Sequence, residues 1–164
     1  YKPERCVWHH VSTLDDDYPD YRDLLHLQLP GDGAYFVAMF PRKRGSAAPS
    51  FKSLCDGKVI MAQGAFGTDY SFLNHEKSKA SGEVFSFEGT AAAIQNRSDG
   101  LTLSLAAVGR VSFGEFALSS KFPAEAHFLP RKRKIVLHKS KENQIVTLKA
   151  PDKWRLLDLT GVDK

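Results

Sequence analysis

The sequence predicts an all-β protein, and more closely an antiparallel β-sandwich of two packed sheets. Apolar and polar residues alternate in many short runs, which is typical of strands with one buried face. Turn-forming residues recur about every 8–12 positions, as in sandwiches and barrels. No long window carries the apolar stripe of a helix. The 164 residues, 42% hydrophobic and 26% charged, suit one globular domain over 1–164 and exclude collagen-like, disordered and disulfide-dense chains.

The first expected strands lie at residues 5–12, rich in β-branched and aromatic side chains, and at residues 22–29, where leucines come to alternate with polar residues. A Pro-Gly-Asp-Gly turn at 30–33 leads into the apolar run 34–40. Because this run is short and is bounded by Gly and Pro, it is predicted to be a strand buried on both faces.

The later strands follow the same rhythm, and turn residues such as Gly, Pro, Asn and Asp separate many of them. One polar face per strand argues for antiparallel sheets that each pack one face on a shared core. These further strands are expected at residues 58–63, 68–73, 83–88, 91–95, 101–105, 110–113, 115–119, 124–129, 134–138, 143–149 and 154–159.

The net charge of +4 is spread unevenly along the chain. Residues 1–120 hold 12 Lys and Arg against 14 Asp and Glu, whereas residues 121–164 hold 11 against 5. Two short basic runs at expected strand connections could attract a polyanion together if both fall at one end of the sandwich. Arginine also pairs with carboxylate and sulfate oxygens in a bidentate way. The candidate contacts are Arg42, Lys43, Arg44, Arg131, Lys132, Arg133 and Lys134.

The basic runs have two other interpretations. The first, which stays open, is that they only provide solubilising charge at turns and form no binding surface. Nucleic acid is disfavoured as a partner, because the runs lack interleaved aromatic residues that would stack on bases and the total charge is modest. No apolar run approaches the ~20 residues of a membrane helix, so no membrane partner is expected.

The chain has neither the Gly-x-Ser-x-Gly elbow of a serine nucleophile nor a Walker loop. The glycines within residues 64–67 are spaced for a turn between strands, and no helix follows whose N-terminus could hold a phosphate, so no cofactor is expected. The acidic stretch with Asp15, Asp16 and Asp17 lacks the Gly and the distal Glu of an EF-hand loop. It favours a solvated loop, with an irregular Ca²⁺ site as the alternative. Cys6 and Cys55 have no metal-ligand spacing and are either one disulfide or two free thiols, the latter being favoured.

Four segments, at residues 24–29, 34–42, 56–60 and 67–73, resemble the C-terminal β-sandwich region of heparinase II/III-type polysaccharide lyases. In those enzymes a strand ends in a Phe/Tyr-Pro-Arg-like corner, here Phe-Pro-Arg, and a later strand carries a Thr-Asp-Tyr-x-Phe-like segment. The resemblance covers roughly residues 21–115. The helical toroid that supplies the family's main catalytic Tyr and His has no counterpart in this sequence, so no catalytic residue carries over.

This resemblance implies an accessory module of a secreted or periplasmic protein that degrades uronate-containing polysaccharide. The start at Tyr1 rather than Met agrees with a module of a longer protein. The implied partners are anionic polysaccharide, contacted through the basic runs, and a catalytic domain that the module supports. Tyr70 is a further candidate for stacking on a sugar. By itself the chain is then expected to be non-catalytic.

Two alternatives belong to other classes. The chain could be a self-contained polysaccharide lyase on a β scaffold, since β-elimination needs a carboxylate neutraliser and a base. Tyr70, His75, Arg42 and His127 are residues of the required types, and their spacing singles out none of them. The chain could also be a sandwich that binds a polyanion or another protein.

Overall fold

The computed structural model describes the backbone of residues 5–12 and 21–28, and residues 36–38, 41, 43–151 and 153–158 with their side chains. The chain divides into two compact units, Tyr1–Tyr35 and Phe36–Lys164. The first unit contains an antiparallel pair, β1 (Arg5–Ser12) and β2 (Tyr21–Gln28), which confirms the first two predicted strands. The single domain over 1–164 stays a prediction.

The second unit is a sheet of 11 strands, and no α-helix occurs in its described residues, so the predicted all-β class is confirmed. A single 3₁₀ turn, η1 (Pro130–Lys132), connects two of the strands. The strands are β3 (Ser50–Leu54), β4 (Val59–Gly64), β5 (Gly67–Ser81), β6 (Phe85–Asn96), β7 (Leu101–Leu105), β8 (Gly109–Phe113), β9 (Phe116–Ser120), β10 (Ala124–Leu129), β11 (Lys134–Lys139), β12 (Val146–Lys149) and β13 (Arg155–Asp158).

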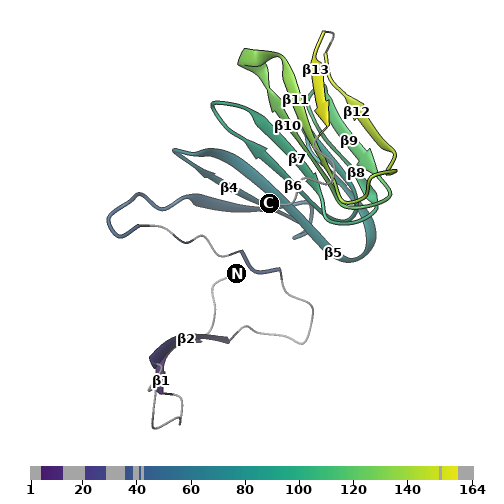
Figure 1. Ribbon diagram of the computed structural model, residues 1–164. Helices are drawn as coiled ribbons and strands as arrows, with labels where there is room; N and C mark the ends of the chain where they lie inside the picture. Colours follow the sequence, from purple (N-terminus) through teal and green to yellow (C-terminus); the bar gives the residue numbers. More distant parts are fainter. Residues whose placement is uncertain are drawn as a thin grey trace. The chain divides into compact units, whose positions relative to one another are not determined.

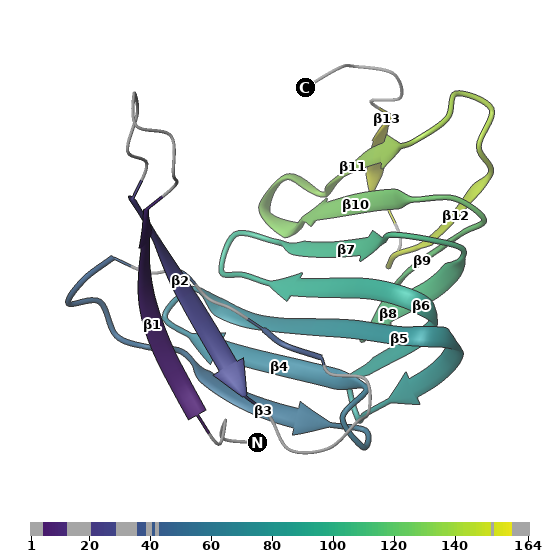
Figure 2. The same cartoon turned by 90° about the horizontal axis from the view of Figure 1, so that it is seen from below.

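The sheet forks at β6, as Figure 1 and Figure 2 show. One edge of β6 pairs with β5, whereas the other edge pairs with β8 over its first half and with β7 over its second half. The first branch continues from β7 through β10 and β11 to β13, and the second branch from β8 through β9 to β12. All pairs are antiparallel except β11 with β13. The described strands of this unit therefore form one continuous sheet with two branches, and the predicted sandwich of two packed sheets is not confirmed.

The core lies where the inner faces of the two branches meet. Alternation places Leu103 and Phe128 of the first branch and Val111 and Leu118 of the second branch in positions with 0% exposure. The ring of Phe116 in β9 lies 4.8 Å from the ring of Phe128 in β10, so aromatic packing joins the branches directly. This arrangement leaves the opposite face of each branch free to carry polar and charged side chains.

One predicted strand is wrong in the part that the structure describes. Residues 36–38 of the apolar run 34–40 have no strand pairing, and Val37 is 50% exposed. The composition of the run predicted burial, but apolar residues are buried only where a neighbouring strand or layer covers them. The remaining residues of that run lie outside the described residues.

Two further differences concern strand length. The strands predicted at 83–88 and 91–95 are one strand, because β6 continues through Gly89 with φ +141°, a conformation that favours glycine. A Cβ at Gly89 would lie 2.9 Å from the carbonyl oxygen of Val108. β5 is also longer than predicted and reaches Ser81, with a register shift between Leu73 and Ser78. β3 was missed, because its residues are mostly exposed and show little alternation.

Candidate anion-binding surfaces

A cluster of basic side chains forms where β10 turns into β11 and β13 begins. The turn is η1 followed by Arg133, whose φ of 45° and N–H bond to the Pro130 carbonyl (3.1 Å) close it. The N–H of Arg155 donates to the carbonyl of Arg133 at 2.8 Å, so the start of β13 is fixed beside this turn. We call the resulting surface the basic corner, which comprises Arg131, Lys132, Arg133, Lys134, Lys153 and Arg155.

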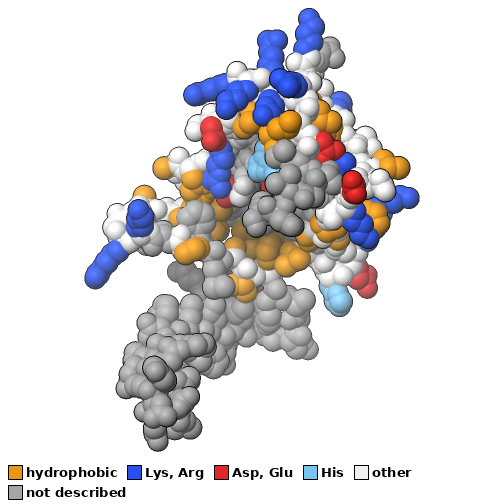
Figure 3. Space-filling model, viewed as in Figure 1, with side chains coloured by type: hydrophobic (Ala, Val, Ile, Leu, Met, Phe, Trp, Pro, Cys, Tyr) orange, Lys and Arg blue, Asp and Glu red, His pale blue; other side chains and the backbone are white. Residues whose placement is uncertain are grey.

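The side chains of the basic corner are mostly open to solvent. Lys134 is half-buried and the other five residues are exposed. None of the six forms an ion pair with any residue that the structure describes. Figure 3 shows Lys and Arg side chains gathered at the top of the view, over this end of the first branch. Such a cluster produces a positive potential that attracts anions.

The first basic run lies elsewhere on the same unit. Lys43 and Arg44 are exposed before β3, and Arg42 lies outside the described residues. The cross-strand registers place the start of β3 and the end of β10 at the same end of the sheet. However, β4, β5, β6 and β7 lie between them, which corresponds to about 24 Å along the sheet. This span exceeds a Debye length of about 8 Å, so the two runs are separate surfaces.

Tyr70, the candidate for sugar stacking, is a core residue. It is 9% exposed, and its ring lies 4.9 Å from that of Phe85 and 6.0 Å from that of Phe113. Its cross-strand partner Ile94 is also fully buried. Tyr70 therefore belongs to the inner face of the sheet and is not available to a ligand on the surface.

The outer face of the first branch carries a polar network around His127. The Nε2 of His127 lies 2.7 Å from Oε1 of Glu125, and its Nδ1 lies 3.0 Å from Oγ1 of Thr102. The Oγ of Ser104 donates to Oε2 of Glu125 at 2.9 Å. Both ring nitrogens of His127 thus have partners within the sheet. The ring of His138 lies 5.4 Å from that of His127.

The four residues considered for a lyase do not assemble in the described part of the chain. Tyr70 is buried, His127 is held by two neighbours, and His75 is exposed on the irregular segment of β5. Arg42 lies outside the described residues, as do Asp15, Asp16 and Asp17 of the acidic stretch. Among the described residues, no three His, Cys, Asp or Glu side chains are placed to hold a metal ion.

Cys55 is a free thiol, and its Sγ donates to the carbonyl of Ser81 at 3.5 Å. The side chain of Cys6 lies outside the described residues. Of the two alternatives for the cysteines, the structure thus shows a free thiol at Cys55.

In the described part of the chain, no helix is long and apolar enough to cross a membrane.

Arg97 is a cation that the fold uses internally. Its Nη2 pairs with Oδ2 of Asp69 at 2.8 Å, its Nη1 donates to the carbonyl of Phe66 at 3.2 Å, and its guanidinium lies 4.5 Å from the centroid of the Phe66 ring. These contacts tie the β6–β7 turn to the β4–β5 turn. Arg97 is therefore occupied and adds little to an anion-binding surface.

Burial raises the pKa of Asp69 above its usual value of 3.8, and Arg97 opposes this shift through its charge and hydrogen bond. Because the pKa is raised in the folded state, the contribution of Asp69 to stability is present below pH 3.8 and is lost as the pH rises through the folded pKa. We expect carboxyl-carbon NMR to give a midpoint above 3.8 for Asp69. The substitution Arg97→Gln should raise this midpoint further. A midpoint at or below 3.8 would contradict the dominance of burial.

The basic corner includes two residues that the sequence analysis missed. Lys153 and Arg155 join the run at 131–134 only because β13 pairs in parallel with β11. Three basic residues fall between 149 and 155, and this local excess was the available signal.

No protein-family model, curated protein or solved structure matches this chain. The interpretation of the site therefore depends on its own chemistry.

Proposed function

We propose that this chain is an accessory all-β module that binds anionic, uronate-containing polysaccharide through the basic corner, within or beside a polysaccharide-degrading protein. The observation that carries the proposal is the cluster of six cations with no acidic partner among the described residues. Arg131, Arg133 and Arg155 each offer a planar guanidinium that can pair with a carboxylate or sulfate in a bidentate way. Turn and strand geometry fix the backbone positions of all three.

The surroundings of the basic corner favour a glycan over a nucleic acid. Trp154 is the aromatic residue between Lys153 and Arg155, but it packs inward, with its ring 5.4 Å from that of Phe116 and 6.2 Å from that of Phe128. The described corner therefore presents no free aromatic face on which bases could stack. Its charged groups instead suit a chain of carboxylates spaced along a polymer.

Affinity electrophoresis tests the proposal. In gels that contain polygalacturonate or heparin, the protein should be retarded relative to a gel with neutral dextran. The variant Arg131→Gln, Lys132→Gln, Lys153→Gln, Arg155→Gln should bind about 30-fold more weakly, if each exposed charge contributes about 0.5 kcal/mol. Added salt should weaken binding by the native protein more than binding by this variant.

A variant with the same loss of charge is the control. Lys43→Gln, Arg44→Gln, Lys52→Gln and Lys58→Gln remove four cations around β3 and the β3–β4 turn and should preserve most of the affinity. An equal loss in the two variants would mean that net charge, not the basic corner, causes retardation. No retardation of the native protein would exclude glycan binding. Absorbance of an unsaturated product from the pure chain would instead support the self-contained lyase.

A further inference from the structure

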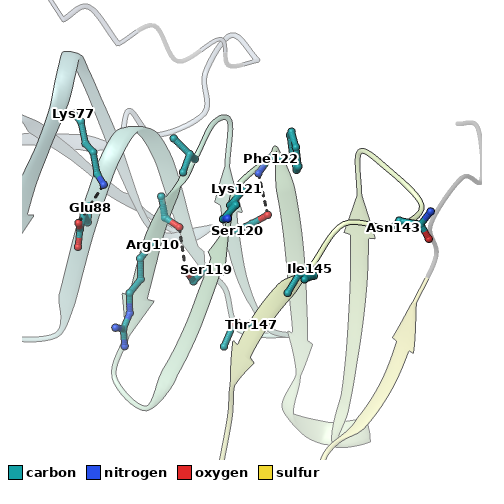
Figure 4. A pocket seen from close by; sticks show the side chains of 12 residues that line it. Lys77, Glu88, Arg110, Ser119, Ser120, Lys121, Phe122, Asn143, Ile145 and Thr147 are labelled. Atoms are coloured by element: carbon teal, nitrogen blue, oxygen red, sulfur yellow. Dashed lines mark hydrogen bonds and ion pairs between the residues drawn. The ribbon is translucent and has the colours of Figure 1, made fainter.

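A second surface lies on the outer face of the second branch, where a hollow of about 480 Å³ opens to solvent (Figure 4). Its floor is one row of cross-strand neighbours, Glu88, Arg110, Ser119 and Thr147, on β6, β8, β9 and β12. Its rim comes from the β7–β8, β9–β10 and β11–β12 connections. These connections lie at the Ala124 end of β10, because Ala124 follows the β9–β10 connection and pairs with Leu105 of β7 and Lys139 of β11. The basic corner follows β10 at Leu129, so the two surfaces lie at opposite ends of that strand.

The buried side chain of Gln144 holds two of the rim connections together. It is 6% exposed, and its Oε1 accepts bonds from the backbone N–H of Ser140 (3.1 Å) and Lys141 (3.2 Å). Its Nε2 lies 2.7 Å from Oγ of Ser120 and 3.3 Å from the carbonyl of Phe122. The side chains on these connections are thus presented by a fixed backbone, which lowers the entropy cost of binding a partner.

The rim reverses the usual distribution of polar and apolar residues. Gln144 is buried, whereas the adjacent Ile145 is 85% exposed. Val108 and Phe122, on the other two connections, are 50% and 39% exposed. A buried polar group beside an exposed apolar patch is the informative departure from ordinary burial, and such patches mark interaction sites.

The hollow also carries an excess of positive charge. Glu88 is its acidic residue, and its carboxylate lies 3.5 Å from the ammonium groups of both Lys77 and Lys79. Arg110 and Lys121 also line the hollow, and neither forms an ion pair with any described residue. A partner must therefore bring carboxylates to Arg110 and Lys121 as well as an apolar group to the rim.

We infer that this hollow docks a segment of another protein in which apolar side chains are flanked by Asp or Glu. Charge complementarity selects an acidic segment, and the aliphatic rim of Val108 and Ile145 selects apolar side chains. A sugar ring fits less well, because its flat face stacks on aromatic rings, and the Nζ of Lys141 already lies 4.2 Å from the centroid of the Phe122 ring. This inference does not depend on glycan binding at the basic corner.

The test is a titration of the full, isotopically labelled chain, followed by amide NMR. The probe is an acetylated octapeptide with two central leucines and three glutamates on either side, used at about 1 mM, a range suited to a small contact. The amides of Ser119, Lys121, Asn143 and Ile145 should shift. An octapeptide with glycines in place of the leucines, and one with lysines in place of the glutamates, should leave them unchanged.

Two variants locate the contact. One variant is Ile145→Ser, and the other combines Arg110→Gln with Lys121→Gln. Each should lower the affinity for the leucine peptide at least about fivefold, or about 1 kcal/mol. The control Leu156→Ser changes an exposed aliphatic residue on β13 (52% exposed) and should leave the affinity unchanged. The inference is overturned if the leucine peptide causes no shifts, if the glycine peptide shifts the same amides equally, or if oligogalacturonate does so more strongly. Shifts that depend on protein concentration alone would indicate a second copy of the chain as the occupant.

Discussion

Replacing Phe128 with alanine should lower the free energy of unfolding by about 3–5 kcal/mol. The ring is 0% exposed and lies 4.8 Å from the ring of Phe116 and 6.2 Å from that of Trp154. Since Phe116 is in the second branch and Phe128 in the first, the lost ring leaves a cavity between the branches as well as lost contacts. Urea unfolding with a two-state fit measures the effect.

The matched control is Phe51→Ala, the same substitution on β3. Phe51 is 50% exposed, so its replacement should cost less than about 1 kcal/mol. A similarly small cost at Phe128 would mean that the two branches do not depend on this aromatic contact.

The second large effect is expected at Gln144, where alanine should lower the free energy of unfolding by about 3 kcal/mol. Removal of the amide leaves two part-buried backbone groups without a hydrogen-bond partner among the described residues, and each such group carries a penalty of about 1–3 kcal/mol unless water reaches it. These groups are the N–H of Lys141 and the carbonyl of Phe122. The N–H of Ser140 still donates to the carbonyl of Pro123 at 3.3 Å, and the Oγ of Ser120 still accepts from the N–H of Phe122 at 3.2 Å.

Gln144→Ala should also lower the affinity of the hollow for the acidic leucine peptide, because the rim connections would no longer be held in place. Gln63→Ala is the control, since Gln63 is exposed on β4 and its side chain has no hydrogen bond among the described residues. Thermal unfolding of both variants, together with the peptide titration, separates the two effects. Unchanged peptide affinity in a destabilised but folded Gln144→Ala protein would show that the rim is fixed by other contacts.

The sequence predicted most strands because alternation and turn residues are local properties. Leu101, Leu103 and Leu105 lie on the inner face of β7, as their spacing indicated. The fork could not be predicted in this way, since it depends on which strand pairs with each half of β6. Gly89, read as a strand boundary, instead permits β6 to continue past the point where its partner changes from β8 to β7.

The candidate sites show the same division between local and distant information. The run at 131–134 was visible in the sequence, but Lys153 and Arg155 reach it only through the parallel pairing of β13. Tyr70 was considered as an exposed sugar platform because its type suited that role, yet its place in the alternation of β5 is on the inner face. The sequence pattern did not distinguish Gln144, because a buried polar residue in a polar connection has the same local pattern as its exposed neighbours.

The fork has a consequence for the solubility of the protein. An open sheet without branches has two unpaired edges, whereas in the described part of this chain the branching leaves three, at β3, β12 and β13. Exposed edges invite strand addition from other molecules and thus aggregation. These three strands are short, with 5, 4 and 4 residues, and they carry Lys52, Lys149 and Arg155 respectively. Short length and positive charge oppose such pairing, so part of the charge on this chain protects its edges.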